Sequence, residues 1–172
     1  NQTAPTRGVQ WMNTARWING VSRVSNSFTQ WESTFSYFVN LMPPNQVVLA
    51  GRIGGGANYG NYEFFQAQYL GGNESLRGYR NFRFAGDKRF YNNLDLRIRL
   101  TELRGYILPG TLGLLFFQDI GRVWLKNESS RRWHLGYGGG LWLAPANRFV
   151  LAACYGQSEE GGLPFVSLGF QF

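Results

Sequence analysis

The stretch 92-NNLDLRIRL-100 alternates, one residue at a time, between two kinds of side chain. Leu94 and Leu96 fall on one side of the chain, whereas Asp95 and Arg97 fall on the other. Because successive side chains of a β-strand point to opposite faces, this period of two predicts a strand with one apolar face and one charged face. The alternation leaves open which of the two faces meets the protein interior.

The same alternation recurs along the chain and predicts about nine strands, several near the length of roughly ten residues that a tilted membrane strand needs. One face of each is apolar and often aromatic near its ends, and the other carries Arg, Glu, Asp, Gln, Ser and Gly. The predicted strands are 7–19, 29–41, 47–55, 64–70, 92–100, 111–124, 133–143, 149–156 and 165–172.

Composition favours a transmembrane β-barrel over a soluble β-sandwich, the other architecture with alternating strands. Aromatic residues make up 17% of the chain and charged residues only 16%, which is little charge for a soluble surface. Trp and Tyr near strand ends are typical of interfacial girdles. We therefore predict an all-β, antiparallel transmembrane barrel, forming a single domain over residues 1–172, with apolar faces toward lipid and polar faces toward the lumen; the resemblance described below implies the bacterial outer membrane as its location.

Several other classes of protein are disfavoured. The opening NQTAPTRGVQ lacks the apolar core of a signal peptide, so we expect a mature product or a fragment. The sequence has no uninterrupted apolar run of about 18 residues, so we expect no transmembrane helix. The net charge of +7 fits nucleic acid, an anionic membrane or a cationic lumen alike. Cys154 and His134 are each the single residue of their type, so we expect no catalytic residue, no metal site and no cofactor.

A long connection, 71-GGNESLRGYRNFRFAG-86, separates two predicted strands and holds glycines, arginines and aromatics together. At Leu76, Arg77, Gly78 and Tyr79 it resembles the BamA/TpsB superfamily of outer-membrane barrels, the bacterial surface antigen family. In that family a Val/Leu-Arg-Gly-Phe/Tyr signature lies on a loop that folds back into the lumen. The resemblance therefore implies that the loop 71–87 lies inside the barrel.

Further motifs of the family match in the same order along the chain. Its Phe-x-Asp-x-Gly motif matches Phe117, Asp119 and Gly121, and its acidic residue on the intervening strand matches Asp95. Its C-terminal strand signal matches Leu168, Phe170 and Phe172, which we expect on the lipid-facing side of a last strand.

The physics of the loop agrees with the resemblance. Ordering a long loop costs conformational entropy, which a partly buried Arg–carboxylate bond can offset. By the alternation, Asp95 and Asp119 both point to the polar face, where the Arg77 guanidinium could reach them. We also expect Gly78 to adopt a backbone conformation closed to other residues. The aromatic residues expected to pack the loop against the wall are Tyr79, Phe82 and Phe84.

The resemblance implies a non-enzymatic protein that inserts polypeptides into the outer membrane or translocates them across it. Its expected partners are outer-membrane lipid, unfolded outer-membrane or secreted proteins as clients, and a second copy or accessory subunits, with no nucleic acid. Two alternatives remain open: a barrel that anchors or displays a fused domain, and a small passive pore.

The strand number departs from the family pattern of about sixteen strands behind periplasmic repeats. Three explanations stay open: the C-terminal half of a longer protein, a short barrel that closes on itself, or one of two copies that join. Because an odd number of strands would leave the end strands parallel on closure, we expect the first segment to lie partly outside the barrel, leaving eight.

Overall fold

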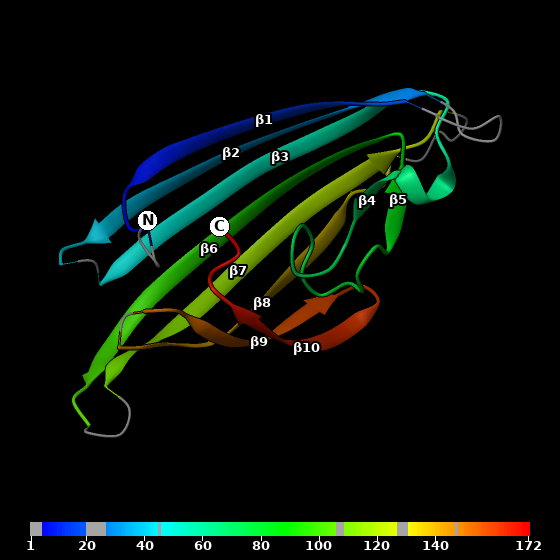
Figure 1. The fold of residues 1–172 in the computed structure, drawn as a ribbon. Coiled ribbons are helices and arrows are strands. Elements are labelled where there is room, and N and C mark those ends of the chain that lie inside the picture. Colours follow the sequence, from blue (N-terminus) through cyan, green and yellow to red (C-terminus); the bar gives the residue numbers. More distant parts are fainter. Residues whose placement is uncertain (1–4, 20–26, 45, 106–108, 127–130, 147) are drawn as a thin grey trace.

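The computed structural model describes residues 5–19, 27–44, 46–105, 109–126, 131–146 and 148–172. Its main element is one 8-stranded antiparallel sheet in which sequence neighbours pair in turn. The strands, in spatial order, are β1 (Gly8–Ile18), β2 (Phe28–Met42), β3 (Val47–Gly60), β6 (Lys88–Leu103), β7 (Gly110–Trp124), β8 (His134–Pro145), β9 (Leu151–Ser158) and β10 (Gly161–Leu168). Figure 1 shows the sheet curved into a trough, which confirms the predicted all-β antiparallel wall. Within the described residues, no helix is long and apolar enough to span a membrane.

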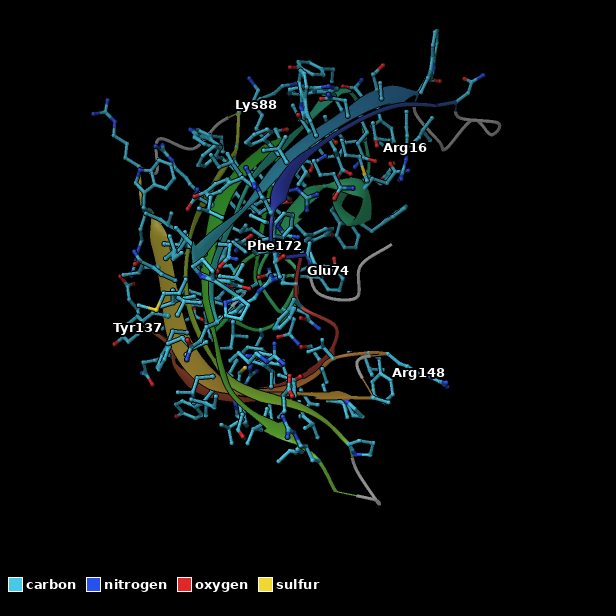
Figure 2. The ribbon with its side chains drawn as sticks, turned by 90° about the vertical axis from the view of Figure 1, so that its left-hand side faces the viewer. Arg16, Glu74, Lys88, Tyr137, Arg148 and Phe172 are labelled. Carbon is cyan, nitrogen blue, oxygen red and sulfur yellow. The ribbon has the colours of Figure 1, made fainter. Side chains whose placement is uncertain are left out.

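The curvature separates the two faces that the sequence pattern predicts. On β7, Asp119 is 0% exposed on the concave face, whereas Phe116, three residues earlier and facing outward, is 47% exposed. Figure 2 shows Tyr137 outside the curve of the sheet and Glu74 and Phe172 inside it. Large exposed apolar side chains on the convex face include Trp11, Trp17, Trp31, Phe35, Tyr137, Leu141, Tyr155, Val166 and Leu168. The convex face therefore carries the surface that suits lipid.

The two ends of the sheet differ in the length of their connections. The connections between β2 and β3 and between β8 and β9 are short and lie at the same end as the start of β1. The long excursion over residues 61–87 leaves from the opposite end, between β3 and β6. Because outer-membrane barrels have short periplasmic turns and longer external loops, the excursion marks the external end.

The expectation that residues 64–70 form a wall strand is wrong. Phe64–Gln66 forms a short 3-10 helix, η1, and β4 (Gln68–Leu70) pairs with β5 (Phe84–Gly86) in a separate two-stranded sheet. The backbone N–H of Glu63 donates to Oε1 of Gln66 at 3.0 Å, a reciprocal cap that stabilises a helical turn instead. The eight wall strands include the first segment, β1, and exclude residues 64–70.

The expectation for the last strand is also corrected. The strand β10 ends at Leu168, and Gly169 adopts a φ of +88°, which turns the chain away from the strand direction. The C-terminal segment, residues 169–172, then crosses the concave face, where Phe170 packs against Trp142 with ring centroids 5.4 Å apart. Leu168 thus faces outward, whereas Phe170 and Phe172 lie inside the curve of the sheet.

Candidate functional site

Arg77 is the central contact between the inward loop, residues 71–87, and the concave wall. The Arg77 Nε donates to Asp119 Oδ2 at 2.7 Å and its Nη2 donates to Asp119 Oδ1 at 2.6 Å, a bidentate arrangement. Nη2 also donates to Asp95 Oδ1 at 2.7 Å, and the Arg77 backbone N–H donates to Asp119 Oδ2 at 2.8 Å. We call Arg77, Asp95 and Asp119 the Arg77 clamp; it ties the loop to β6 and β7 at once.

The Arg77 clamp is shielded from solvent. Arg77 is 2% exposed and both carboxylates are 0% exposed. The guanidinium also lies over the Phe117 ring, 4.0 Å from its centroid, in a cation–π contact. Removing one partner from a buried ion pair leaves an uncompensated charge and typically costs about 3–5 kcal/mol. The clamp therefore holds the loop strongly only while all of its members are present.

Close backbone approach accompanies the charge contacts. Gly78 adopts a φ of +90°, and a Cβ built on it would lie 2.9 Å from the Gln157 carbonyl oxygen. Ser158 Oγ on β9 donates to the Gly78 carbonyl oxygen at 2.7 Å. On the wall, a Cβ on Gly156 would lie 2.9 Å from the Gly78 nitrogen. The loop backbone thus lies against the wall at a glycine, where no side chain separates the two backbones.

Apolar side chains fill the space between loop and wall at the external end. Leu76 is fully buried and packs in one cluster with Leu70, Tyr79 and Tyr91. A Cβ on Gly121 would meet the Leu70 side chain at 2.8 Å, so the glycine makes room for the loop.

Of the loop aromatics, two pack against the wall and one does not. Tyr79 and Phe84 stack edge-to-face, and Phe84 lies parallel to the His134 ring at 3.7 Å. The expectation that Phe82 packs against the wall is wrong: Phe82 is 72% exposed and contacts Tyr69 within the excursion itself.

A family model described as the Omp85 superfamily domain matches residues 1–172. The chain belongs to the Omp85 superfamily. This assignment confirms the family resemblance seen in the sequence and places the chain in the bacterial outer membrane. The convex face of this Omp85 wall therefore meets lipid, and the concave face with the Arg77 clamp lines the lumen.

Solved structures resemble this Omp85 chain, one of them over nearly its whole length. The crystal structure of BamA from Haemophilus ducreyi lacking POTRA domains 1–3 superposes with a TM-score of 0.75 at 17% sequence identity. The match covers 96% of this chain and 39% of that chain, so the Omp85 chain spans well under half the length of its structural relative. The likeness shows the fold. No curated protein sequence matches the chain.

The Omp85 wall brings together most of the residues that the motifs singled out. Around the Arg77 clamp lie Leu76, Gly78, Tyr79, Phe117 and Gly121. The three residues of the expected C-terminal signal are split instead between the two faces. Leu168 is 79% exposed on the convex face.

Two further lumen arginines tie the C-terminal segment of the Omp85 chain to the clamp. Arg97 Nη2 lies 3.4 Å from Asp95 Oδ2 and donates to the Phe172 carbonyl oxygen at 2.7 Å. Its guanidinium also lies 3.9 Å from the Phe170 ring centroid. Arg52 Nη2 donates to Asn93 Oδ1 at 2.9 Å, and the Asn93 amide donates to the Ser75 carbonyl oxygen at the same distance. Loop, wall and C-terminal segment therefore share one polar network.

Sequence reasoning missed the wall groups that receive the loop backbone. They are Gly136, Gly156 and Ser158, which lie on β8 and β9. In the sequence Gly136 and Gly156 appear only as glycines on the polar face, and Ser158 lies in the stretch SEEGGLP, which predicts a turn. The one signal available was the spacing of glycines in 136-GYGGG-140, where alternate positions face the lumen without a side chain.

Proposed function

We propose that this chain forms part of the wall of an outer-membrane barrel that inserts polypeptides into the membrane or translocates them across it, without catalysing a chemical reaction. The Arg77 clamp is the observation that carries the proposal. It holds a loop on the lumen side by a buried, charge-assisted contact, although a passive wall needs no such loop. In the proposal the loop forms an ordered part of the lumen surface, which a polypeptide contacts while it is inserted or translocated.

The edges of the sheet support the same proposal. Among the described strands, β1 and β10 each pair on one side only. Unpaired backbone groups cost several kcal/mol each in lipid, so such an edge favours pairing with another strand. An extended client segment could supply that strand by β-augmentation.

The edge at β10 is built to pair weakly. Pro164 lies within β10 and has no backbone N–H to offer, and Gly169 breaks the strand direction just beyond Leu168. A strand pair formed at the β10 edge would lack one backbone N–H donor and would be short. It therefore separates at a lower free-energy cost than a full-length strand pair. Clients of this kind would be unfolded outer-membrane proteins or secreted polypeptides, whose segments can add as strands.

The proposal is tested by reconstitution of the full chain in liposomes together with an unfolded outer-membrane client. Insertion is followed by the heat-modifiable gel mobility of the client. We expect Arg77→Ala to lower the insertion rate at least about tenfold, since losing the buried pair costs several kcal/mol. The matched control is Arg80→Ala, which removes an exposed arginine of the same loop.

Each outcome bears on one function. Client insertion that depends on Arg77 but not on Arg80 supports the proposal. No insertion by the unaltered chain overturns it in favour of an anchor or display barrel. Ion conductance unchanged by Arg77→Ala, without client insertion, overturns it in favour of a passive pore.

A further inference from the structure

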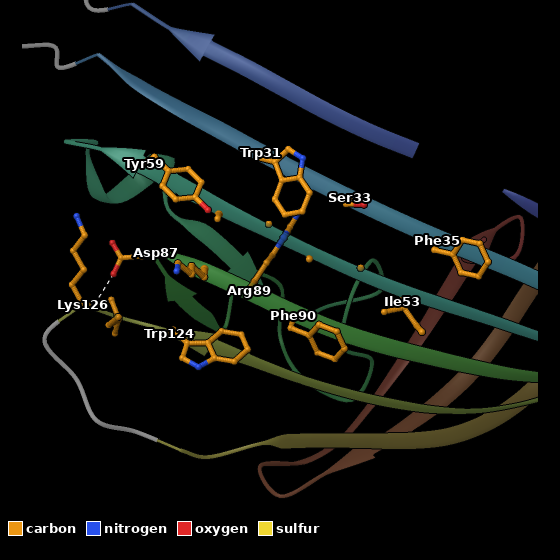
Figure 3. A pocket seen from close by; sticks show the side chains of 16 residues that line it. Trp31, Ser33, Phe35, Ile53, Tyr59, Asp87, Arg89, Phe90, Trp124 and Lys126 are labelled. Atoms are coloured by element: carbon orange, nitrogen blue, oxygen red, sulfur yellow. Dashed lines mark hydrogen bonds between the residues drawn. The ribbon is translucent and has the colours of Figure 1, made fainter. Parts of the chain in front are cut away.

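The convex, lipid-facing wall carries a hollow near the external end. It has a volume of about 720 Å³ and lies over β2, β3 and β6 (Figure 3). Across its floor, Ser33, Gly55 and Phe90 occupy one row of directly paired residues. The next row toward the external end contains Trp31, Ala57, Lys88 and Trp124. The floor at Gly55 and Ala57 is thus made of small residues, with the aromatic side chains of the two rows beside it.

The hollow exists because of the triple glycine of β3. Gly54 and Gly56 face the lumen, where added Cβ atoms would collide with Tyr91 and Gln68. Gly55 faces outward, and a Cβ built on it would contact only the Arg89 carbonyl oxygen, at 3.2 Å. Glycine is therefore required at 54 and 56 by the packed lumen, whereas at 55 it leaves a gap toward lipid.

Two lysines, Lys88 and Lys126, line the external rim of this hollow. Lys88 pairs directly with Trp124, and Arg122 pairs with Phe90, so Lys88 and Arg122 are diagonal neighbours on the convex face. The Arg122 guanidinium lies 4.8 Å from the centroid of the Trp124 ring. Lys126, two residues beyond the end of β7, also lines the hollow.

The outward-facing cations of β6 and β7 lie only at the external end of these strands. On β6 and β7, the outward charged positions are Lys88 and Arg122, both at the external end, whereas Asp95, Arg97 and Asp119 point to the lumen. A lipid-facing Lys or Arg costs about 2–4 kcal/mol at the bilayer midplane and about 0–1 near the interface. Near the interface the same charges attract anionic headgroups.

Among the described residues that line the hollow, the one carboxylate is already engaged. Asp87 Oδ1 accepts from the Tyr62 hydroxyl, and its Oδ2 accepts from the Lys126 backbone N–H, which joins the ends of β6 and β7. Within this described lining, an anion at the rim would meet the Lys88 and Lys126 ammonium groups.

We propose that this hollow is a specific binding site for a lipid of the external leaflet whose headgroup carries phosphate. One acyl chain lies on the floor at Gly55 and Ala57, between the Trp31 and Phe90 side chains. The phosphate binds Lys88 and Lys126, where charge and hydrogen-bond donors match it. The site belongs to the outer surface of the wall and does not depend on the handling of polypeptides in the lumen.

The test is native mass spectrometry of the full chain in detergent micelles, titrated with diphosphoryl lipid A and, separately, with a phosphate-free diacylglycerol. We expect saturable binding of lipid A by the unaltered chain. Each basic residue near an anionic surface contributes enough that its loss weakens binding about fivefold, so K88Q/K126Q should weaken it about 25-fold. Heat-modifiable gel mobility reports that each variant is folded.

Two variants separate the parts of the site. Gly55→Leu fills the floor and should weaken lipid A binding with Lys88 and Lys126 retained. Arg104→Gln removes one charge just beyond the opposite end of β6 and should leave binding unchanged. Equal binding of lipid A by K88Q/K126Q and the unaltered chain, or equally tight binding of the diacylglycerol, would overturn the proposal.

Discussion

Gly136 lies directly beneath Arg77: a side chain at Gly136 would overlap the backbone carbonyl oxygen of Arg77. Gly136 is also the register partner of Asp119, the carboxylate that binds the Arg77 guanidinium. One cross-strand pair therefore supplies both requirements for docking the inward loop. Asp119 supplies the charge, and Gly136 supplies the space.

Gly136→Ala should displace the inward loop without removing a single charge. The added methyl group has backbone rather than a flexible side chain in its way, so the loop must move. We expect protease cleavage in residues 71–87 to become about tenfold faster, which corresponds to about 1.4 kcal/mol of docking free energy. Gly105→Ala is the control, because a Cβ there meets open space. Equal cleavage of both variants would show that the close approach is unimportant.

The two carboxylates of the Arg77 clamp should contribute unequally. Asp119 accepts from the Arg77 Nε, Nη2 and backbone N–H, whereas Asp95 accepts from Nη2 alone. Asp119→Asn should therefore open the loop at a cost of about 3–5 kcal/mol, with Asp95→Asn costing less. Hydrogen exchange of the loop amides in micelles measures both. An Asp95 variant with the greater exchange would mean that the bidentate bond is not the main contact.

An exposed ion pair at the external end should make the outer part of the loop sensitive to pH. Arg83 lies 2.8 Å from Glu160, and this hydrogen bond lowers the pKa of Glu160 below its ordinary value. The contact therefore stabilises the loop above the ordinary glutamate pKa of about 4.3 and is lost as the pH falls below it.

The measurement is hydrogen exchange near Arg83 across that pH range, corrected for the intrinsic exchange rate. We expect a small loss of protection below about pH 4.3, and a similar small loss in high salt, because the pair is solvent-exposed. Glu160→Gln should abolish the pH step. A step that persists in Glu160→Gln would assign the titration to another group.

The wall could be predicted from the sequence because a period of two needs only local geometry. Residues 92–100 alternate without interruption and form the middle of β6. Residues 64–70 alternate as well, yet they fold outside the wall, because the Glu63–Gln66 cap favours a helical turn. The alternation of apolar and polar residues does not reveal a local hydrogen bond that favours a helical turn over a strand.

The candidate site could be predicted only as far as side-chain chemistry identifies partners. Arg77 and Asp119 carry opposite charge at motif positions, so their proximity follows from the resemblance and the alternation. Gly136 and Ser158 act through the backbone of a loop that is remote in sequence. Their roles depend on where that backbone passes, which no single strand pattern specifies.

The C-terminal residues offer a direct comparison between packing in the lumen and contact with lipid. Phe170 lies against Trp142 and 3.9 Å from the Arg97 guanidinium, whereas Leu168, two residues earlier, is 79% exposed on the convex face. Phe170→Ala should destabilise the folded wall by about 2 kcal/mol, less than a fully buried Phe because the ring is half-buried. Leu168→Ala removes apolar surface that lipid contacts in the folded and inserted states alike and should change stability little.

Urea titration of the chain in micelles, followed by tryptophan fluorescence, measures both variants. Trp142 lies beside Phe170, so its emission should also shift to the red in Phe170→Ala before unfolding begins. A larger loss of stability in Leu168→Ala would mean that the terminal residues act as a lipid-facing row, as their alternation alone predicts. A loss confined to Phe170→Ala would mean that they act by closing over Arg97 and the inward loop, which makes this segment part of the lumen network.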